Sequence, residues 1–399
     1  MIKKIIIFIL FFSFFYDLKI SEPFLTVRFF MGGVGAILFF NEMLKNRVTI
    51  KKRYITILLV YTPLLIWNYI SCKYNNTNEF QYSYELKFLF IIFFASFLLV
   101  KISRKNVSSV SQLFDLIIMI ALAQCLIAVL STISDSVHRF VMANSNAMEE
   151  FLAREQGRRL IGLGSAVFFG VLPTGSLALL TCIYQFFHSS RRNRTIYAIC
   201  FFTIFIITFL IARTIIFVAV STVLLYIIYR GSSNKANKFI FILLPIVIFV
   251  LFQKYAQSII GGDMYEWAFN SFSRNSQNTT VQEMYEWYTL THFETKTLWI
   301  GDGRMTTDGG SYYMGIDAGY IRTIFNVGII GLLLYFYYQY YIAKTIYKTT
   351  NNRDLWYFVL AYFLFYFFIM MKGYNSISKE LLFLLVMIDY GHLKIDVIK

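Results

Sequence analysis

The sequence predicts an all-α, polytopic integral membrane protein, and both its composition and its hydropathy pattern support this fold class. Hydrophobic residues make up 58% of the 399 residues and charged residues only 15%, whereas soluble domains average about 45–50% apolar and about 25% charged. Glycine content is ordinary and only four cysteines are present, which excludes collagen-like and disulfide-scaffold proteins. The apolar residues also gather in runs of about 20, the length that crosses a bilayer. These features together exclude a soluble enzyme.

Twelve such runs are predicted to be transmembrane helices of one membrane domain that covers residues 1–399. They are 5–20, 24–42, 54–71, 85–100, 110–131, 161–187, 195–212, 213–229, 238–253, 318–343, 355–371 and 376–390. The apolar stretch 195–229 is too long for a single span, and Arg213 marks the break between two helices. The first run lacks a small-residue cleavage site, so we interpret it as a retained helix rather than a signal peptide.

Membrane topology explains most of the net charge of +15, which comes from 37 basic and 22 acidic residues. Basic residues concentrate in every second connection, for example in 45–53, 101–105 and 191–194. Cytoplasmic loops carry such an excess, so the pattern predicts that both termini are cytoplasmic. An even number of spans satisfies this arrangement. No nucleic-acid partner is needed to explain the charge.

The two longest connections are predicted to lie on the extracytoplasmic side. They are 132–160, the first extracytoplasmic loop, and 254–317, the large extracytoplasmic loop between the ninth and tenth spans. Loops of this length are usually functional. The tetrapeptide Met-Tyr-Glu-Trp occurs twice in the large loop, at 264–267 and at 284–287. Its aromatic residues predict two short helices at the membrane interface.

Sequence motifs for several other activities are absent. The cysteines form no Cys-x-x-Cys pair and the four histidines are scattered, so the spacing of a zinc site does not occur. The chain also has no Gly-rich phosphate loop followed by Lys and Ser or Thr, and no Gly-x-Ser-x-Gly motif. An ATP-driven pump is therefore not predicted, and no metal or cofactor is expected.

Several cationic residues lie where membrane topology does not account for them. Arg28 falls within the second span, and Lys379 falls near the outer end of the last one. Four arginines lie at the extracytoplasmic ends of spans, namely Arg158, Arg159, Arg213 and Arg322. Taken singly, Arg28 fits a buried structural pair, and cations at span ends fit snorkelling towards headgroups. Their gathering on one side instead favours binding of a lipid-linked phosphate or diphosphate, which guanidinium groups hold with paired hydrogen bonds.

Four short motifs follow one another between residues 154 and 335. They are Arg159-Leu160-Ile161-Gly162 with Pro173 and Gly175; Ala212-Arg213-Thr214; Ser273-Arg274 with Trp287 and Gly301-Asp302-Gly303; and Asp317-Ala318-Gly319-Tyr320-Ile321-Arg322 with Gly328-Ile329-Ile330-Gly331. Their order and their positions relative to the spans resemble the Wzy-type O-antigen and capsular polysaccharide polymerases. The interval from Arg274 to Trp287 departs from the family pattern because it is longer.

The resemblance implies a GT-C-like membrane glycosyltransferase that is inverting and metal-independent. Such polymerases move a growing glycan from undecaprenyl diphosphate onto a new lipid-linked repeat unit, at the outer face of the bacterial cytoplasmic membrane. The implied partners are these lipid-linked oligosaccharides and membrane lipids, together with a chain-length regulator and a flippase.

The resemblance also suggests roles for individual side chains, because fixed cations stabilise a leaving diphosphate and a carboxylate can deprotonate the acceptor hydroxyl. The expected cations are Arg158, Arg159, Arg213, Arg274, Arg304 and Arg322, of which Arg213 and Arg322 are assigned to catalysis. Asp317 is the first choice for the base, with helix N-cap as its alternative role, and Asp302 is the second choice. Gly301 and Gly303 are expected to permit a tight turn. Tyr320 is expected to contact a sugar ring or to belong to an interfacial aromatic belt.

Two alternative functions stay open. O-antigen ligases are related proteins that typically carry a histidine near the Gly-x-Gly segment, whereas 301–306 contains none and His292 lies upstream. The other alternative is a secondary transporter or lipid-linked oligosaccharide flippase of about twelve spans. A transporter built from two halves concentrates its charges near the membrane midplane, whereas most of the unexplained arginines here lie near the outer surface. The sequence therefore favours the polymerase.

Overall fold

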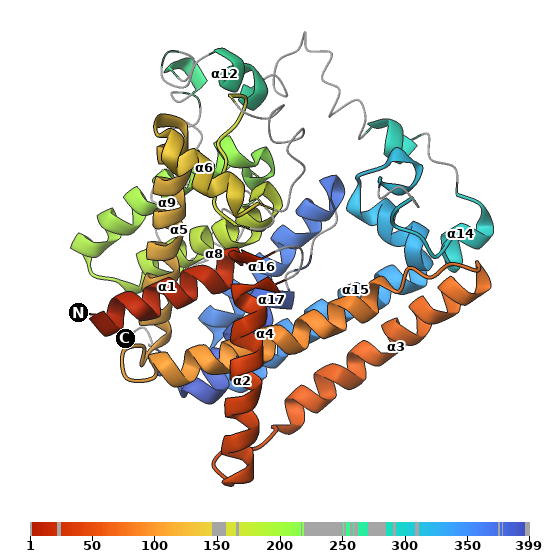
Figure 1. Ribbon diagram of the computed structural model, residues 1–399, viewed down its shortest axis with the longest axis horizontal. Coiled ribbons are helices and arrows are strands. Elements are labelled where there is room, and N and C mark those ends of the chain that lie inside the picture. The colour runs from red at the N-terminus through yellow and green to blue at the C-terminus, as the bar shows by residue number, and fades with distance from the viewer. Residues whose placement is uncertain are drawn as a thin grey trace.

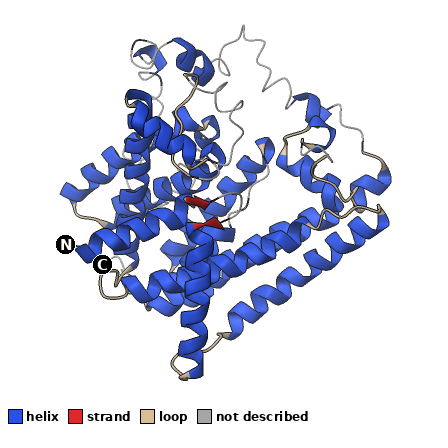
Figure 2. Cartoon of the chain, viewed as in Figure 1, coloured by secondary structure: helices blue, strands red, loops and turns tan. Residues whose placement is uncertain are grey.

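The structure is a computed structural model that describes most of the chain. The described residues are 2–21, 25–145, 157–164, 167–216, 218, 250, 253–255, 258, 262–269, 285–289, 293–307, 311–373, 376 and 378–395 (Figure 1). Almost all of the described elements are helices (Figure 2), and the prediction of an all-α chain is confirmed.

Eight of the described helices are long and apolar enough to cross a membrane, so the chain is a polytopic membrane protein. They are α2 (Val27–Leu44), α3 (Lys52–Tyr74), α4 (Gln81–Ser103), α5 (Val110–Ile133), α8 (Val167–His188), α9 (Arg191–Ile211), α15 (Gly319–Thr350) and α16 (Arg353–Lys372). Each coincides with one of the predicted spans. Helices α1 (Ile2–Tyr16) and α17 (Ser378–Gly391) coincide with the first and last predicted spans and are shorter. The predicted spans 213–229 and 238–253 lie mostly outside the described residues.

Three span boundaries differ from the predicted ones. Helix α1 ends at Tyr16 because Asp17 adopts a φ of 51°, and a small hairpin of β1 (Lys19–Ser21) and β2 (Leu25–Thr26) follows. Helix α8 begins only at Val167, since 160–164 is not helical. Helix α15 continues to Thr350, seven residues beyond the predicted limit of 343. Hydropathy alone sets none of these ends, because each depends on a local backbone conformation.

Short helices also occur in both of the long connections. Helix α6 (Asp135–Ala143) lies in the first, and α12 (Gly262–Phe269) and α14 (Thr295–Trp299) lie in the second. Residues 285–289 are helical too. The helical part of the prediction for the two Met-Tyr-Glu-Trp copies is therefore confirmed for 264–267 and for 285–287, and their position at the membrane interface stays a prediction.

Polar side chains begin three of the long helices. The hydroxyl of Thr26 accepts a hydrogen bond from the backbone N–H of Phe29 at the start of α2. Ser109 caps α5 in the same way, and the Asn352 side chain caps α16 by accepting from Leu355 N at 2.8 Å. Such caps satisfy backbone donors that a helix leaves without partners in its first turn. They place these helix starts at the boundaries between apolar spans.

The long helices pack in a few main pairs. Helix α2 packs mainly against α4, α3 against α15, α8 against α9 and α5, and α15 against α16. Aromatic side chains fill much of the core, and Phe383 of α17 contacts the rings of Phe11, Phe14 and Phe15 of α1. The two terminal helices are thus packed against each other through these rings.

One set of contacts joins helix ends that the predicted alternation assigns to the extracytoplasmic side. Lys379 Nζ donates to the carbonyl of Phe15 at 3.4 Å, which joins the start of α17 to the end of α1. Asn75, just after α3, donates to the carbonyl of Gly301 at 2.8 Å. We call the end of the bundle that includes these ends and the start of α15 the Arg322 face.

A second set of contacts joins the opposite helix ends. Lys51 Nζ lies 3.1 Å from a carboxylate oxygen of Asp389, which joins the start of α3 to the end of α17. The backbone N–H of Val110 donates to the carbonyl of Lys394 at 3.0 Å. We call this end the Lys51 face. Each contact of both sets joins ends that the predicted alternation places on the same side, so the contacts of α1, α3, α5 and α17 agree with that alternation.

Candidate functional site

The first turn of α15 brings three of the polar residues near its start together. Helix α15 begins after Ala318, so its first turn carries Arg322 back over Asp317, and Arg322 Nη1 lies 3.6 Å from Asp317 Oδ1. The guanidinium also lies over the ring of Tyr312, 4.4 Å from its centroid. Such stacking is a favoured environment for a planar arginine group. The two residues assigned to catalysis at this end of the chain are thus neighbours.

The guanidinium of Arg322 is mostly enclosed, yet it keeps an unused donor. Its side chain is 13% exposed. Its Nε is buried and has no hydrogen-bond partner within the described part of the chain. A buried donor without a partner costs free energy, roughly 1–3 kcal/mol. An anion bound beside Arg322 would remove that cost.

Asp317 does not occupy the N-cap position of α15. The N-cap residue is Ala318, which makes no side-chain cap. Tyr312 donates a hydrogen bond to Asp317, and burial together with the charge of Asp317 raises the pKa of the Tyr312 hydroxyl. Tyr312 therefore stays protonated and acts as a donor at neutral pH. Asp317 faces both Tyr312 and Arg322, an arrangement that orients its carboxylate.

A loop with two left-handed glycines packs against the middle of α15. Gly301 and Gly303 have φ values of 86° and 67°, which confirms that both permit tight turns. A Cβ on Gly301 would lie 2.6 Å from the backbone nitrogen of Val327. Helix α15 itself is interrupted at Gly328, with φ 65° and ψ −175°. The loop and the interruption therefore fit together closely.

Side chains of α3 bind the backbone groups at the α15 interruption. Trp67 Nε1 donates to the carbonyl of Val327 at 2.8 Å, and the hydroxyl of Ser71 donates to the carbonyl of Asn326 at 2.7 Å. The Asn68 amide donates to the side-chain oxygen of Asn326 at 3.0 Å. Backbone freed within a membrane must find such partners. Sequence reasoning missed Asn68 and Asn326, although two amide side chains within apolar spans were a usable signal.

The Gly301–Gly303 loop is also held by two carboxylates. Asp302 accepts a hydrogen bond from the hydroxyl of Thr297 at 2.6 Å. Glu79, which follows α3, accepts from the backbone N–H groups of Met305 at 2.7 Å and Thr306 at 3.2 Å. These bonds give both carboxylates a structural role in the loop. Glu79 was not recognised in the sequence because it lies outside every motif.

Two further predicted site residues, Arg304 and Tyr320, lie close to this loop and to the start of α15. Burial and the charge of Asp302 raise the pKa of Tyr313, whereas Arg304 lowers it, so all three lie near one another. The hydroxyl of Tyr320 donates to the carbonyl of Phe367 in α16 at 2.7 Å. The Tyr320 hydroxyl therefore links α15 to α16 and is not free for a sugar.

The backbone segments that carry Arg159 and Arg213 meet at another part of the Arg322 face. The N–H of Leu160 donates to the carbonyl of Leu210 at 3.1 Å, next to the end of α9. A short 3-10 helix, η1 (Arg213–Ile215), follows and packs against α8 and α9. Helix α15 packs instead against α3, α14, α16 and α17. The structure thus divides the predicted arginines between two groups of helices.

The other predicted arginines differ in their exposure. Arg158 is exposed and Arg159 is partly buried. Arg274 lies outside the described residues. The segment that follows Arg159 is anchored to α5, because Gln124 donates to the carbonyl of Leu163 at 2.9 Å. The segment therefore has a defined place in the bundle.

Four charged residues gather at the end of α1, of which Arg28 and Glu380 are buried and Asp17 and Lys379 are mostly enclosed. Arg28 is 5% exposed and pairs with Asp17 at 3.2 Å, so the prediction of a buried structural pair is confirmed. Lys379 pairs with the fully buried Glu380 at 2.9 Å, and its side chain is 12% exposed. The prediction that Lys379 snorkels to headgroups is therefore wrong. The neighbouring Glu380, which sequence reasoning did not consider, draws the ammonium into the bundle.

No group of three or more His, Cys, Asp or Glu side chains suited to a metal ion occurs among the described residues. No family model matches the chain, and no curated protein and no solved structure matches it significantly.

Proposed function

We propose that this protein polymerises oligosaccharide repeat units linked to undecaprenyl diphosphate into a surface polysaccharide. It does so as an inverting, metal-independent membrane glycosyltransferase with twelve spans and its large loop between the ninth and tenth. The order of the four motifs between residues 154 and 335 supports this proposal. Its site is the Arg322 face, which is extracytoplasmic in the bacterial cytoplasmic membrane, with both termini on the other side.

The observation that carries the proposal is the environment of Arg322. Its guanidinium is enclosed, stacks on Tyr312 and keeps a buried Nε donor without a described partner. A diphosphate oxygen would supply that partner, and bidentate contacts to phosphate are what a guanidinium fork favours. Arg322 is thus suited to stabilise the charge that develops on a leaving diphosphate.

The reaction needs few groups from the protein. The acceptor hydroxyl loses its proton to Asp317, and its oxygen forms a bond to the anomeric carbon of the growing glycan. The bond between that carbon and the diphosphate oxygen breaks, and the diphosphate leaves with the electron pair. Arg322 holds the diphosphate beside Asp317, and Arg159 and Arg213 bind the other lipid-linked chain. A neighbouring Tyr312 keeps the Asp317 carboxylate in place through its hydrogen bond.

Gene deletion with complementation tests this function. A strain without the protein should keep single repeat units on its surface glycan and lose the ladder of longer chains on a gel. Wild-type protein should restore the ladder, whereas Arg322→Ala and Arg213→Ala should not, at normal protein level. Arg158→Ala, at an exposed position, is the matched control and should restore more of the ladder than either. An unaltered ladder with Arg322→Ala would refute the assignment of Arg322.

A lipid-linked oligosaccharide flippase is the second candidate, and the buried charges at α1 favour it. Asp17, Arg28, Lys379 and Glu380 lie inside the bundle, and charges within a membrane often mark a transport pathway. The deletion strain distinguishes the two functions. A flippase mutant would lose even single lipid-linked units at the outer leaflet. A ligase mutant, the third possibility, would instead accumulate long chains that stay on the lipid carrier.

A further inference from the structure

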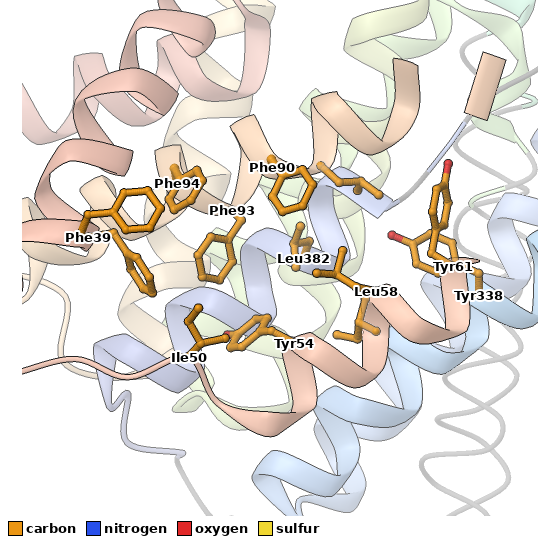
Figure 3. Close-up of a pocket in the computed structure, with 13 residues that line it drawn as sticks. Phe39, Ile50, Tyr54, Leu58, Tyr61, Phe90, Phe93, Phe94, Tyr338 and Leu382 are labelled. Carbon is orange, nitrogen blue, oxygen red and sulfur yellow. The ribbon is translucent and has the colours of Figure 1, made fainter. Parts of the chain in front are cut away.

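An apolar groove lies between α3 and the α2–α4 pair. Its volume is about 200 Å³, and Figure 3 shows the side chains that line it. The groove is lined by Phe39, Phe40, Ile50, Tyr54, Ile57, Leu58, Tyr61, Leu89, Phe90, Phe93, Phe94, Tyr338 and Leu382. Its floor includes the fully buried Tyr61, whereas Ile50 on its rim is 48% exposed. The groove is therefore open to the surroundings of the bundle.

The packing of the helices creates this groove. Helix α2 packs mainly against α4 and α3 mainly against α15, whereas α3 and α4 make little contact with each other. Aromatic rings brace the walls, since Tyr54 of α3 meets the edge of Phe93 of α4 with ring centroids 5.0 Å apart. Rigid rings lose little entropy on binding, so the walls are prepared for an apolar ligand such as an acyl chain.

The groove reaches the Lys51 face, and basic residues surround its end there. Ile50 lines the groove directly beside Lys51, whose Nζ lies 5.0 Å from the ring centroid of Tyr390. That ring stacks on Tyr54, another lining residue, at 5.6 Å. Lys51 and Arg53 both pair with a single carboxylate, that of Asp389, at 3.1 and 3.0 Å. Two cations against one anion leave an excess of positive charge.

Three more cations of the same segment increase this excess. Lys45, Arg47 and Lys52 are exposed, and none of them forms an ion pair with another described residue. Glu42, the nearest acidic residue along the chain, is paired with Lys101 at 2.9 Å. The groove therefore ends at a cluster of cations, which matches the phosphate of a lipid headgroup.

We propose that this groove binds an anionic phospholipid, with one acyl chain in the groove and the phosphate at the cations of 45–53. The charge at the groove end favours an anionic over a zwitterionic lipid. The groove opens at the face opposite Arg322, so this lipid is distinct from the lipid-linked glycan of the proposed function. Its effect on the protein is to fill the space between α3 and α4. Helix α3 also holds the α15 interruption through Ser71, so the bound lipid supports the helix that anchors the Arg322 face.

Photocrosslinking in vesicles of defined lipids tests this proposal. The full-length protein is placed in phosphatidylcholine vesicles that contain phosphatidylglycerol with a photoreactive diazirine on its acyl chain. Crosslinks should concentrate on the groove residues of 39–61 and 89–94. Unlabelled phosphatidylglycerol should compete for them, and phosphatidylcholine should not. Lys52→Gln should weaken this competition by about fivefold, the effect of one basic residue at a membrane surface.

Matched variants separate the groove from general lipid contact. Leu58→Trp adds bulk on the rim of the groove and should remove most of the crosslinking. Leu59→Trp, at an exposed position of α3 outside the groove, should leave it unchanged, and Lys105→Gln controls for charge on the same face. Crosslinks spread evenly over the lipid-exposed helices, or equal competition by phosphatidylcholine, would overturn the proposal. Competition by polyprenyl phosphate but not by phosphatidylglycerol would overturn it as well.

Discussion

Arg28 and Arg322 both lie near the same face of the bundle and each has an aspartate partner, yet their environments differ. Arg28 uses all parts of its guanidinium inside the protein. Its Nε donates to the carbonyl of Phe14 at 2.7 Å, its Nη2 to that of Phe15 at 3.1 Å, and its Nη1 pairs with Asp17 at 3.2 Å. Arg322 has its aspartate only at 3.6 Å and keeps a buried Nε without a described partner.

This difference separates a structural arginine from one that is ready to bind a ligand. The last carbonyls of a helix lack partners within that helix, and Arg28 supplies donors to two of them at the end of α1. Each of the three guanidinium nitrogens of Arg28 thus already has a partner in the protein. Arg322, in contrast, gains a hydrogen bond when an anion arrives. Both residues were singled out in the sequence for the same reason, so only their surroundings distinguish them.

Arg28→Ala should have the largest effect of all the variants, and this effect should be on folding. The variant leaves Asp17 buried without its partner and two α1 carbonyls without donors, at a cost of roughly 3–5 kcal/mol. The amount of protein in the membrane should fall sharply, and the unfolding temperature in mild detergent should fall with it. Arg28→Lys, which keeps the charge, should recover part of the loss. Normal abundance of Arg28→Ala would contradict the structural role.

Arg322→Gln should show the opposite pattern. Loss of one preorganised donor to a developing charge reduces a rate by about 10²–10³-fold, so polymerisation should nearly stop. Folding should be maintained, since the distance from Arg322 to Asp317 is long and the Arg322 Nε has no described partner in the folded protein. Activity of purified protein on lipid-linked repeat units, measured together with the unfolding temperature, checks both parts. A large loss of stability with Arg322→Gln would remove the distinction from Arg28.

The contrast between these two arginines also shows what could be predicted from the sequence. The eight long helices follow from the apolar runs, because bilayer thickness sets helix length. The Asp317–Arg322 pair could be predicted, since the first turn of a helix brings its residues back over those that directly precede the helix. The pairing of Lys379 with Glu380 was not, because snorkelling and burial give the same sequence pattern. The α15 interruption also depends on distant side chains of α3, such as Asn68, which binds Asn326 across 258 residues of the chain.

The loop that supports the start of α15 offers a smaller effect. Gly301→Ala places a methyl group 2.6 Å from Val327 N at a φ of 86°, so strain of about 1–3 kcal/mol is expected. Gly315→Ala is the matched control, because its φ of 70° is also positive but nothing lies within 4 Å of an added Cβ. Gly301→Ala should lower both the unfolding temperature and polymerisation more than Gly315→Ala does. Equal effects of the two variants would show that the close packing of Gly301 against α15 is unimportant.

The smallest expected effect concerns Tyr312, and it appears only at alkaline pH. Burial first, and the charge of Asp317 second, raise the pKa of Tyr312 in the folded protein. The unfolded chain therefore deprotonates at a lower pH than the folded one, so the stabilisation is complete below about pH 10 and is lost as the pH rises towards the folded pKa. Tyr312→Phe has no proton to lose and should show a smaller fall in unfolding temperature between pH 9 and 11, values chosen to bracket the ordinary tyrosine pKa of about 10.

The matched control for this pH experiment is Tyr255→Phe, because Tyr255 is exposed. That variant should follow the wild-type profile at every pH. Tyr312→Phe also removes the hydrogen bond to Asp317, so at neutral pH it should slow polymerisation while Arg322 stays in place. If the profile of Tyr312→Phe matches that of the wild type, Tyr312 does not lie against Asp317 as described. Arg322 would then lack the fixed neighbours that distinguish it from a free surface cation.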